Sequence, residues 1–300
     1  MNIKDSKTLC VILHYGSQDY TDKCIESLVN EKKLDIIISD NDPSQSYEPP
    51  QNIREFVKII KTGGSAGFSE ANNIAVKTFL TKEHGSIFIL SNDTIVIKSA
   101  LDYLRDTLNS SDIGAVGPCM PYVSNPKKIW ACGGYISKLK VAVGGLQPKS
   151  NQPYQVDYLP GAAILCRSDL WKEIGGFNEE YFLAYEEVEF AQEVKKRGFK
   201  VMANPKSIIL HHVGISSQRS PKYYYNGIRN RLIFSKYLYG KKIGLIYAII
   251  ITLFSFLNAR SPKELLQRIR LWTKAIKDDL KDIPISRQIL QSITEQFKDN

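Results

Sequence analysis

Residues 87–95 read IFILSNDTI, in which four apolar residues are followed by Ser91, Asn92 and Asp93. Short continuous apolar runs of this kind are typical of strands that are buried on both faces of a parallel sheet. A carboxylate at the end of such a strand can cap a helix, form a turn or bind a metal ion. The rest of the sequence has to decide among these uses.

Similar apolar runs recur in the first ninety residues and alternate with helical patterns. We predict strands at TLCVIL (8–13), DIIIS (35–39), FVKII (56–60) and IFIL (87–90), with helices from about Thr21 and over 69–80. The first helix should carry Cys24, Leu28 and Val29 on one face. This alternation predicts a mostly parallel central sheet with helices on both faces.

Polar residues stand where two of these strands end. Ligands of open parallel sheets bind beyond the carboxyl ends of the strands, and Asp40 and Asp93 lie there. The loop TGGSAGFSEANN (62–73) adds small residues that let backbone approach a ligand, and Asn72 and Asn73 at a helix start that can bond to it. The loop matches neither G-x-G-x-x-G nor the Walker A pattern, which argues against NAD and P-loop nucleotide binding.

The middle of the chain, residues 114–166, contains short runs separated by Gly and Pro. A helix is expected to follow, with Ser168 as its N-cap and an end at Gly175–Gly176. A second helix is predicted over Tyr185–Arg197, terminated by Gly198, and then a strand at SIILHH (207–212).

Two polar clusters lie in this part of the chain. YFLAYEEVEF (181–190) places Glu186, Glu187 and Glu189 in a first helical turn, where acids favour the helix dipole or, in an apolar setting, form a general base. Glu187 and Glu189 cannot share a helix face. LHHVGIS (210–216) ends a strand with two histidines that point to opposite sides, so that only one can face a site.

The positive charge is concentrated in the last 82 residues. From Arg219 onward there are 16 Lys and Arg against 6 Asp and Glu, whereas the whole chain has a net charge of +9. Such asymmetry predicts an anionic partner. The stretch 243–259 has 17 uncharged positions, slightly short of the roughly 20 that a spanning helix needs.

An amphipathic pattern follows over 263–281. It sets Leu265, Ile269, Trp272 and Ile276 against a basic stripe of Arg270, Lys274, Lys277 and Lys281. Such a helix lies on an anionic membrane surface or packs on the domain with a solvated basic face, and we favour a peripheral membrane helix. The five cysteines are scattered and odd in number, and the N-terminus has too short an apolar run for a secretory signal, so we expect reduced thiols on the cytoplasmic side.

The order of these segments resembles the family 2 glycosyltransferases of the GT-A fold over residues 8–217. Five segments match in order: VILHYGS, ISDNDPS, GGSAGFSEANN, LSNDT and GAAILCRSDLWKEIGGFNEEYFLAYEEVEFAQEVKKRGF. HHVGISS and YYYNGIRNRLIF resemble the rhamnosyltransferase-like branch that builds bacterial surface glycans. The resemblance implies a catalytic GT-A domain over 1–217 and a basic, amphipathic helical region over 218–300.

The resemblance also implies roles for individual residues. Asp93 becomes a metal ligand to the donor diphosphate, with His211, in preference to His212, as a second ligand of Mg²⁺ or Mn²⁺. Glu187 takes the place of the family's catalytic Asp. The nucleotide sugar is assigned to Tyr15, Asp40, Asn41, Gly64, Asn72, Asn92 and Asp93. The acceptor is assigned to Gly161, Tyr185, Glu186, Arg229 and Arg231, although the two arginines suit a solvated helix face nearly as well.

This chain departs from the family pattern at two positions. Ser91 replaces the first Asp of the D-x-D motif, so that metal binding depends on Asp93, water and phosphate. Glu187 is one methylene longer than the family's Asp, which shifts the geometry of the base but leaves its chemistry unchanged.

The activity implied is an inverting, metal-dependent transfer of a hexose. The donor would be a UDP-sugar such as UDP-glucose, or dTDP-rhamnose, and the acceptor a polyprenyl-diphosphate-linked glycan at the cytoplasmic face of the inner membrane. The alternative is a catalytically inactive GT-A domain that serves as a glycan-binding or scaffold subunit. A nucleotidyltransferase is disfavoured because LHYGSQDYT lacks a Gly-rich basic loop, and a nucleic-acid partner because the basic tail contains a long apolar run. A homo-oligomer remains open.

Overall fold

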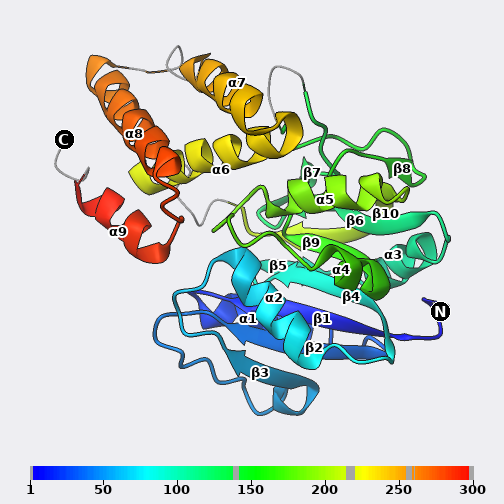
Figure 1. The fold of residues 1–300 in the computed structure, drawn as a ribbon. Coiled ribbons are helices and arrows are strands. Elements are labelled where there is room, and N and C mark those ends of the chain that lie inside the picture. The colour runs from blue at the N-terminus through cyan, green and yellow to red at the C-terminus, as the bar shows by residue number, and fades with distance from the viewer. Residues whose placement is uncertain (1–2, 138–141, 214–219, 255–258, 260, 297–300) are drawn as a thin grey trace.

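A twisted sheet with helices on both faces is followed by a group of C-terminal helices (Figure 1). The computed structural model describes residues 3–137, 142–213, 220–254, 259 and 261–296. The predicted boundary between 217 and 218 lies outside these residues. From residue 221 the described chain forms helices.

The sheet runs in the order β3-β2-β1-β4-β9-β6-β10-β5 through the described residues. Its strands are β3 (Val57–Lys61), β2 (Leu34–Asp40), β1 (Lys7–His14), β4 (His84–Ser91), β9 (Ala163–Arg167), β6 (Ile113–Tyr122), β10 (Lys200–His211) and β5 (Thr94–Val96). Two further strands pair beside this path, β7 (Asn125–Ala131) with β6 and β8 (Tyr154–Gln155) with β10. The four strands from β3 to β4 are parallel, as are β6 and β10, whereas β9 and β5 are antiparallel to their neighbours.

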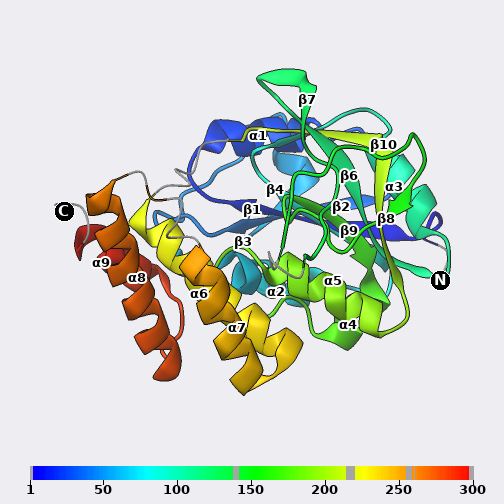
Figure 2. The same ribbon diagram turned by 90° about the horizontal axis from the view of Figure 1, so that it is seen from above.

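Alternate residues of the central strands explain why the sheet needs cover on both faces. In β1, Leu9 and Val11 belong to one hydrophobic cluster, while Cys10 and Ile12 belong to the other. The first cluster is covered by α2 (Phe68–Phe79), α4 (Ser168–Ile174) and α5 (Glu186–Lys196), and the second by α1 (Gln18–Glu26) and α3 (Ala100–Leu108). Because successive residues of a strand point to opposite faces, apolar residues on both faces need cover, and helices lie on both sides of the sheet (Figure 2).

The strand order reverses between β1 and β4, since β2 and β3 lie on one side of β1 and β4 on the other. His14 pairs with Asp40 of β2, and Leu13 pairs with Ser91 of β4. The carboxyl ends of these three strands therefore meet at one edge. Such a reversal is the usual ligand-binding crevice of open α/β sheets.

Several predicted boundaries need correction. Helix α1 ends at Glu26, so Leu28 follows the helix although it is buried. Ser168 is the first helical residue of α4, and its hydroxyl donates to the His84 carbonyl at 2.6 Å instead of capping the helix. The predicted end at Gly175 and the termination of α5 before Gly198 are confirmed by left-handed backbone at both glycines. Strand β10 is longer than predicted because its first half pairs with β6.

The C-terminal helices are α6 (Pro221–Tyr239), α7 (Lys241–Phe254), α8 (Pro262–Leu280) and α9 (Arg287–Gln296), and a short 3₁₀ helix (Arg54–Phe56) precedes β3. Helix α6 joins this group to the sheet domain: Asn226 and Asn230 each donate to the Leu183 carbonyl at 2.7 Å, and Asn230 also bonds to the Ala184 carbonyl at 2.7 Å. Buried amide bonds of this kind fix α6 against the loop that precedes α5.

The apolar set predicted for α8 is divided between packed and exposed positions. Leu271 and Ala275 are buried, with Trp272 and Ile276 beside them, whereas Ile269 is 40% exposed. Asp278 and Asp279 are also buried, because they accept hydrogen bonds from the Tyr225 hydroxyl and the Lys236 ammonium. No helix among the described residues is both long and apolar enough to cross a membrane.

Candidate active site

The reversal edge gathers most of the residues that the sequence assigns to the donor. Tyr15 follows β1 and is 52% exposed, while Asn92 and Asp93 follow β4. The Asn92 amide donates to the Thr21 hydroxyl at 2.9 Å and to the Tyr15 carbonyl at 3.4 Å. These two bonds hold the loops after β1 and β4 together.

Two other residues assigned to the donor, Asp40 and Asn41, are buried and stabilise the loops at this edge. Asp40 is fully buried and accepts from the backbone N–H groups of Asp42 and Tyr47 at 3.2 and 3.4 Å. Asn41 is buried between the Ala66 carbonyl, to which it donates, and the Thr62 hydroxyl, from which it accepts. The Asp40 side chain therefore orders the loop after β2, and the Asn41 side chain connects that loop to the segment after β3.

Gly64 and Asn72 also have local structural functions. At Gly64 the φ angle is +69°, and an added Cβ would lie 2.8 Å from the Pro43 Cα. Glycine is required there because the backbone is left-handed and the neighbouring loop is close. Asn72 is fully buried in α2 and donates to the Phe68 carbonyl, so the structure does not place it on the surface of the edge.

Asp93 and His211 come together as predicted. Strand β5 pairs antiparallel with β10, and the Oδ1 atom of Asp93 lies 3.3 Å from Nε2 of His211. Both the Asp93 Oδ1 and the His211 Nδ1 are buried and have no hydrogen-bond partner among the described residues. The Trp130 ring packs edge-on against His211 with ring centroids 4.4 Å apart, whereas His212 contacts the tilted ring of Tyr20.

This pair fits a divalent cation. A buried carboxylate oxygen without a partner is costly unless a ligand completes it. Asp93 and His211 offer an oxygen and an imidazole nitrogen, and no third His, Cys, Asp or Glu joins them to form a metal cluster within the part of the chain that the structure describes. A cation at this place needs its other ligands from phosphate and water, which is how Mg²⁺ and related ions bind with nucleotides.

Glu186 and Glu187 begin α5 and lie against Gly161. A Cβ added to Gly161 would be 3.6 Å from Oε1 of Glu186 and 3.7 Å from the Glu187 side chain. Burial raises the pKa of Glu187 to about 7, and burial together with the Glu187 charge raises the pKa of Glu186 well above its ordinary value. The Oε2 atoms of Glu186 and Glu187 are buried and have no hydrogen-bond partner among the described residues. A carboxyl group with a pKa near neutrality is suited to proton transfer.

Strained backbone orients this pair. Ala184 and Tyr185 have φ angles of +69° and +78°, a conformation that non-glycine residues rarely adopt. The carbonyl of Ala184 accepts from Asn230 of α6, so the C-terminal helices stabilise the strained turn. Strain that is held by tertiary contacts is characteristic of functional sites.

Glu189 points elsewhere, as the helix geometry predicts. Its carboxylate accepts from the Tyr181 hydroxyl at 2.6 Å and from the Asn178 amide at 3.0 Å. Both carboxylate oxygens of Glu189 are therefore hydrogen-bonded, which gives it a structural role. Glu186 and Glu187 each keep one oxygen without a hydrogen-bond partner among the described residues.

The two arginines assigned to the acceptor have different surroundings. Burial raises the pKa of the Tyr185 phenol, and the charge of Arg231 opposes this shift, so Arg231 lies beside the start of α5. Arg229 is buried, and it donates to the Ile283 carbonyl at 2.7 Å and to the Tyr225 hydroxyl at 3.3 Å. The prediction of a solvated basic face is thus wrong for Arg229. It lines a separate cavity of about 530 Å³ between the 178–180 turn, α6 and residues 282–285, a cavity to which Glu187 does not contribute.

Sequence reasoning missed several aromatic neighbours of the site. Burial raises the pKa of Tyr158 and of Tyr223, and the charge of the neighbouring Glu187 adds to both shifts. Trp130 contacts His211 from β7. No local motif surrounds these residues, and only their positions in the fold reveal them.

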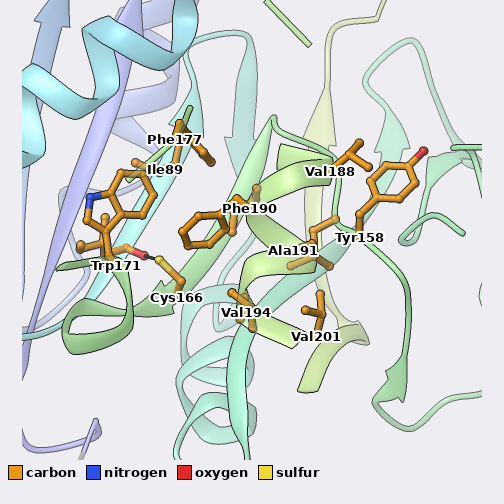
Figure 3. Close-up of a cluster of buried hydrophobic side chains, with 14 of the residues drawn as sticks. Ile89, Tyr158, Cys166, Trp171, Phe177, Val188, Phe190, Ala191, Val194 and Val201 are labelled. Atoms are coloured by element: carbon orange, nitrogen blue, oxygen red, sulfur yellow. Dashed lines mark hydrogen bonds between the residues drawn. The ribbon is translucent and has the colours of Figure 1, made fainter. Parts of the chain in front are cut away.

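The core beneath α5 keeps these groups in place. Val188, Ala191 and Val194 of α5 point into a cluster with Tyr158, Cys166 and Val201 (Figure 3). Phe190 packs between Trp171 and Phe177, with ring centroids 5.1 and 5.4 Å away. A helix anchored along its length holds its first-turn acids in a fixed position.

Comparisons with known proteins agree with this geometry. The model of the family described as glycosyltransferase-like family 2 matches residues 15–231. The low-salt glycan biosynthesis hexosyltransferase Agl10 of Haloferax volcanii is 22% identical over 77% of this chain and 84% of its own length. An N-acetylglucosaminyl-diphospho-decaprenol L-rhamnosyltransferase of Mycobacterium tuberculosis is 23% identical over 65% of this chain and 72% of its own length.

Solved structures support the fold. The mannosyltransferase PcManGT of Pyrobaculum calidifontis, in complex with GDP-Man and Mn²⁺, has a TM-score of 0.56 at 12% identity, covering 98% of this chain and 88% of its own. GalNAc-T7 with UDP, GalNAc and Mn²⁺ has a TM-score of 0.57 at 14% identity; the match covers 88% of this chain but only 56% of the GalNAc-T7 chain. At these identities the likeness shows a GT-A-like α/β fold. With the family model covering most of the chain, this protein belongs to glycosyltransferase-like family 2 and is a glycosyltransferase.

Proposed function

We propose that this protein is an inverting, metal-dependent hexosyltransferase whose catalytic part spans residues 1–217. The proposal rests on two places where buried polar atoms have no hydrogen-bond partner among the described residues. At the first, Asp93 lies beside His211; at the second, Glu187 has a pKa of about 7. The first fits a cation with a diphosphate, and the second fits a base for an acceptor hydroxyl.

The residues divide the reaction between them. Asp93 and His211 would hold Mg²⁺ or Mn²⁺, which neutralises charge on the departing nucleoside diphosphate. Glu187 accepts the proton of the acceptor hydroxyl as that oxygen attacks the anomeric carbon. Attack from the face opposite the leaving group inverts the centre, so a UDP-α-sugar gives a β-linkage and dTDP-β-L-rhamnose gives an α-linkage. The solved neighbours that contain Mn²⁺ with UDP or GDP-Man support a nucleotide-sugar donor.

The proposed acceptor is a polyprenyl-diphosphate-linked glycan. Support comes from the mycobacterial relative, whose name gives a diphospho-decaprenol substrate. Arg231, which lies beside Tyr185, is the cation on the acceptor side of Glu187.

Peripheral attachment to the inner face of the membrane accords with the exposed surface of α7. Ile243, Ile246 and Ile250 are 64%, 60% and 49% exposed and recur at spacings of three and four. Lys241 and Lys242 precede them at the start of the helix. An apolar ridge beside basic residues suits an anionic bilayer surface. The triple change of these isoleucines to serine should abolish flotation with anionic vesicles and leave nucleotide binding intact, and unchanged flotation would remove this part of the proposal.

The first test is nucleoside diphosphate release from UDP-, dTDP- and GDP-sugars, with a polyprenyl-diphosphate glycan and either Mg²⁺ or Mn²⁺. Release should depend on the metal and on one donor, and it should collapse in Glu187→Gln but persist in Glu26→Gln, a change at an exposed glutamate of α1. Tight nucleotide binding without release for any acceptor would favour the alternative, a catalytically inactive scaffold.

A further inference from the structure

An arginine from the C-terminal helices reaches the donor edge. The guanidinium carbon of Arg287, the first residue of α9, lies 4.7 Å from the centroid of the Tyr15 ring. Tyr15 follows β1 at the point where the strand order reverses, and its carbonyl accepts from Asn92, the neighbour of Asp93. The family model ends at residue 231, so Arg287 comes from outside the matched region.

The surroundings of Arg287 leave it with an unused donor. Its Nε atom is buried and has no hydrogen-bond partner among the residues that the structure describes. A guanidinium group stays charged at all physiological pH values, and a partly buried charge needs an acceptor. Contact with the Tyr15 ring supplies some cation–π stabilisation but accepts no hydrogen bond from Nε in the plane of the guanidinium. Among the described residues, the Nε donor of Arg287 therefore has no hydrogen-bond acceptor.

Carboxylates dominate the nearby edge. Asp42 accepts from the Gly16 backbone N–H at 3.0 Å, immediately after Tyr15, and Asp93 follows Asn92. An anionic ligand here needs positive charge, which one divalent cation at Asp93 supplies only in part. Arginine binds phosphate oxygens with two parallel N–H bonds and is well suited to a diphosphate.

Packing fixes the position of Arg287. Ile293 of α9 is fully buried in the cluster that also contains Tyr225 and Leu232 of α6. Ile289 and Leu290 pack against the same cluster, and Ile285 is buried just before the helix. The start of α9 is therefore held at the donor edge by helices that also support the Glu187 turn.

We propose that Arg287 is a donor-binding residue that donates hydrogen bonds to the diphosphate of the nucleotide sugar while its guanidinium rests on Tyr15. This inference rests on the proposed function, because it requires a nucleoside diphosphate at the edge of β1 and β4. It assigns to the C-terminal helices a direct part in substrate binding in addition to support of the fold.

The test compares wild type, Arg287→Gln and Arg270→Gln. The control removes the same charge from an exposed position of α8. Affinities for UDP, dTDP and GDP with Mn²⁺ are measured by calorimetry, and those for uridine, thymidine and guanosine by NMR titration, which detects millimolar binding. Thermal unfolding of each variant shows whether α9 remains docked.

Loss of a charge-assisted hydrogen bond predicts that Arg287→Gln binds the preferred diphosphate about 10-fold to 100-fold more weakly, with nucleoside affinity and melting temperature unchanged. Arg270→Gln should match wild type. Equal loss for nucleoside and diphosphate, unchanged diphosphate affinity, or tighter binding from removal of a blocking side chain would each overturn the assignment. Absence of nucleotide binding in wild type would overturn the proposed function itself and is distinguishable from those results.

Discussion

Replacement of Glu187 by Gln should strongly lower turnover and, at the same time, make the protein more stable at alkaline pH. The carboxyl group is partly buried at the start of α5, and one of its oxygens has no partner among the described residues. Burial raises its pKa from the ordinary value of 4.5 to about 7. Glutamine keeps the shape of the side chain but cannot ionise.

The sign of the stability effect follows from proton binding. Because the raised pKa means that the folded chain holds this proton more tightly than the unfolded chain, rising pH between 4.5 and 7 lowers the free energy of unfolding. The stabilising contribution of Glu187 is fully present below pH 4.5 and is lost by about pH 7. Relative to wild type, Glu187→Gln should therefore gain about 2–3 kcal/mol in free energy of unfolding between about pH 5 and pH 8.5.

Urea unfolding at these two pH values measures the gain, with Glu26→Gln as the exposed control, which should show no pH-dependent difference. In the same samples, turnover should fall by roughly 10²–10⁴-fold, the usual contribution of a general base. The wild-type kcat/KM should rise with pH through about 7 as Glu187 becomes deprotonated. A stability difference that does not vary with pH, or a variant less stable at pH 8.5, would refute the reasoning.

Three further outcomes test the remaining site and its support. Asp93→Asn should weaken Mn²⁺-supported nucleoside diphosphate binding by at least about 10-fold in calorimetry, and an equal loss without metal would contradict its role as a ligand. Tyr181→Phe removes the buried 2.6 Å bond to Glu189 and should lower the free energy of unfolding by about 1–3 kcal/mol in urea, with nucleotide affinity unchanged. Gly67→Ala would place a Cβ 2.6 Å from the Phe182 carbonyl oxygen, so it should cost about 1–3 kcal/mol in thermal unfolding; full stability would show that the two segments separate readily.

Local sequence patterns were sufficient for the strands of the first ninety residues and for the second half of β10. The runs at 8–13, 35–39, 56–60 and 87–90 all form strands, because each is short, apolar and bounded by polar residues. The position of Asp93 at a strand end likewise followed from the sequence, since the end of an apolar run marks the end of a buried strand. Ser168 was misassigned because its hydroxyl bonds to the His84 carbonyl, a contact made by another strand.

Helix faces were harder to assign where charge and burial conflict. The pattern of α8 placed Ile269, Trp272 and Ile276 on one face, yet Ile269 is 40% exposed while Trp272 and Ile276 pack inward and Asp278 and Asp279 are buried. The two acids can be buried because Tyr225 and Lys236 of α6 bond to them. Arg229 was expected on a solvated or acceptor-facing surface and is instead buried by its bonds to Tyr225 and Ile283. A single sequence does not disclose such partners.

The sequence by itself determined the strands of the first ninety residues, the strand-end carboxylate and the acidic first turn of α5, because these depend on residues close together in the chain. Only the tertiary structure decided that Asp93 meets His211, that Gly161 lies against Glu186 and Glu187, and that Arg287 rests on Tyr15. Each of these contacts joins distant segments. Their distances are set by how the helices pack on the sheet, and that packing depends on the whole core, to which every layer of the fold contributes.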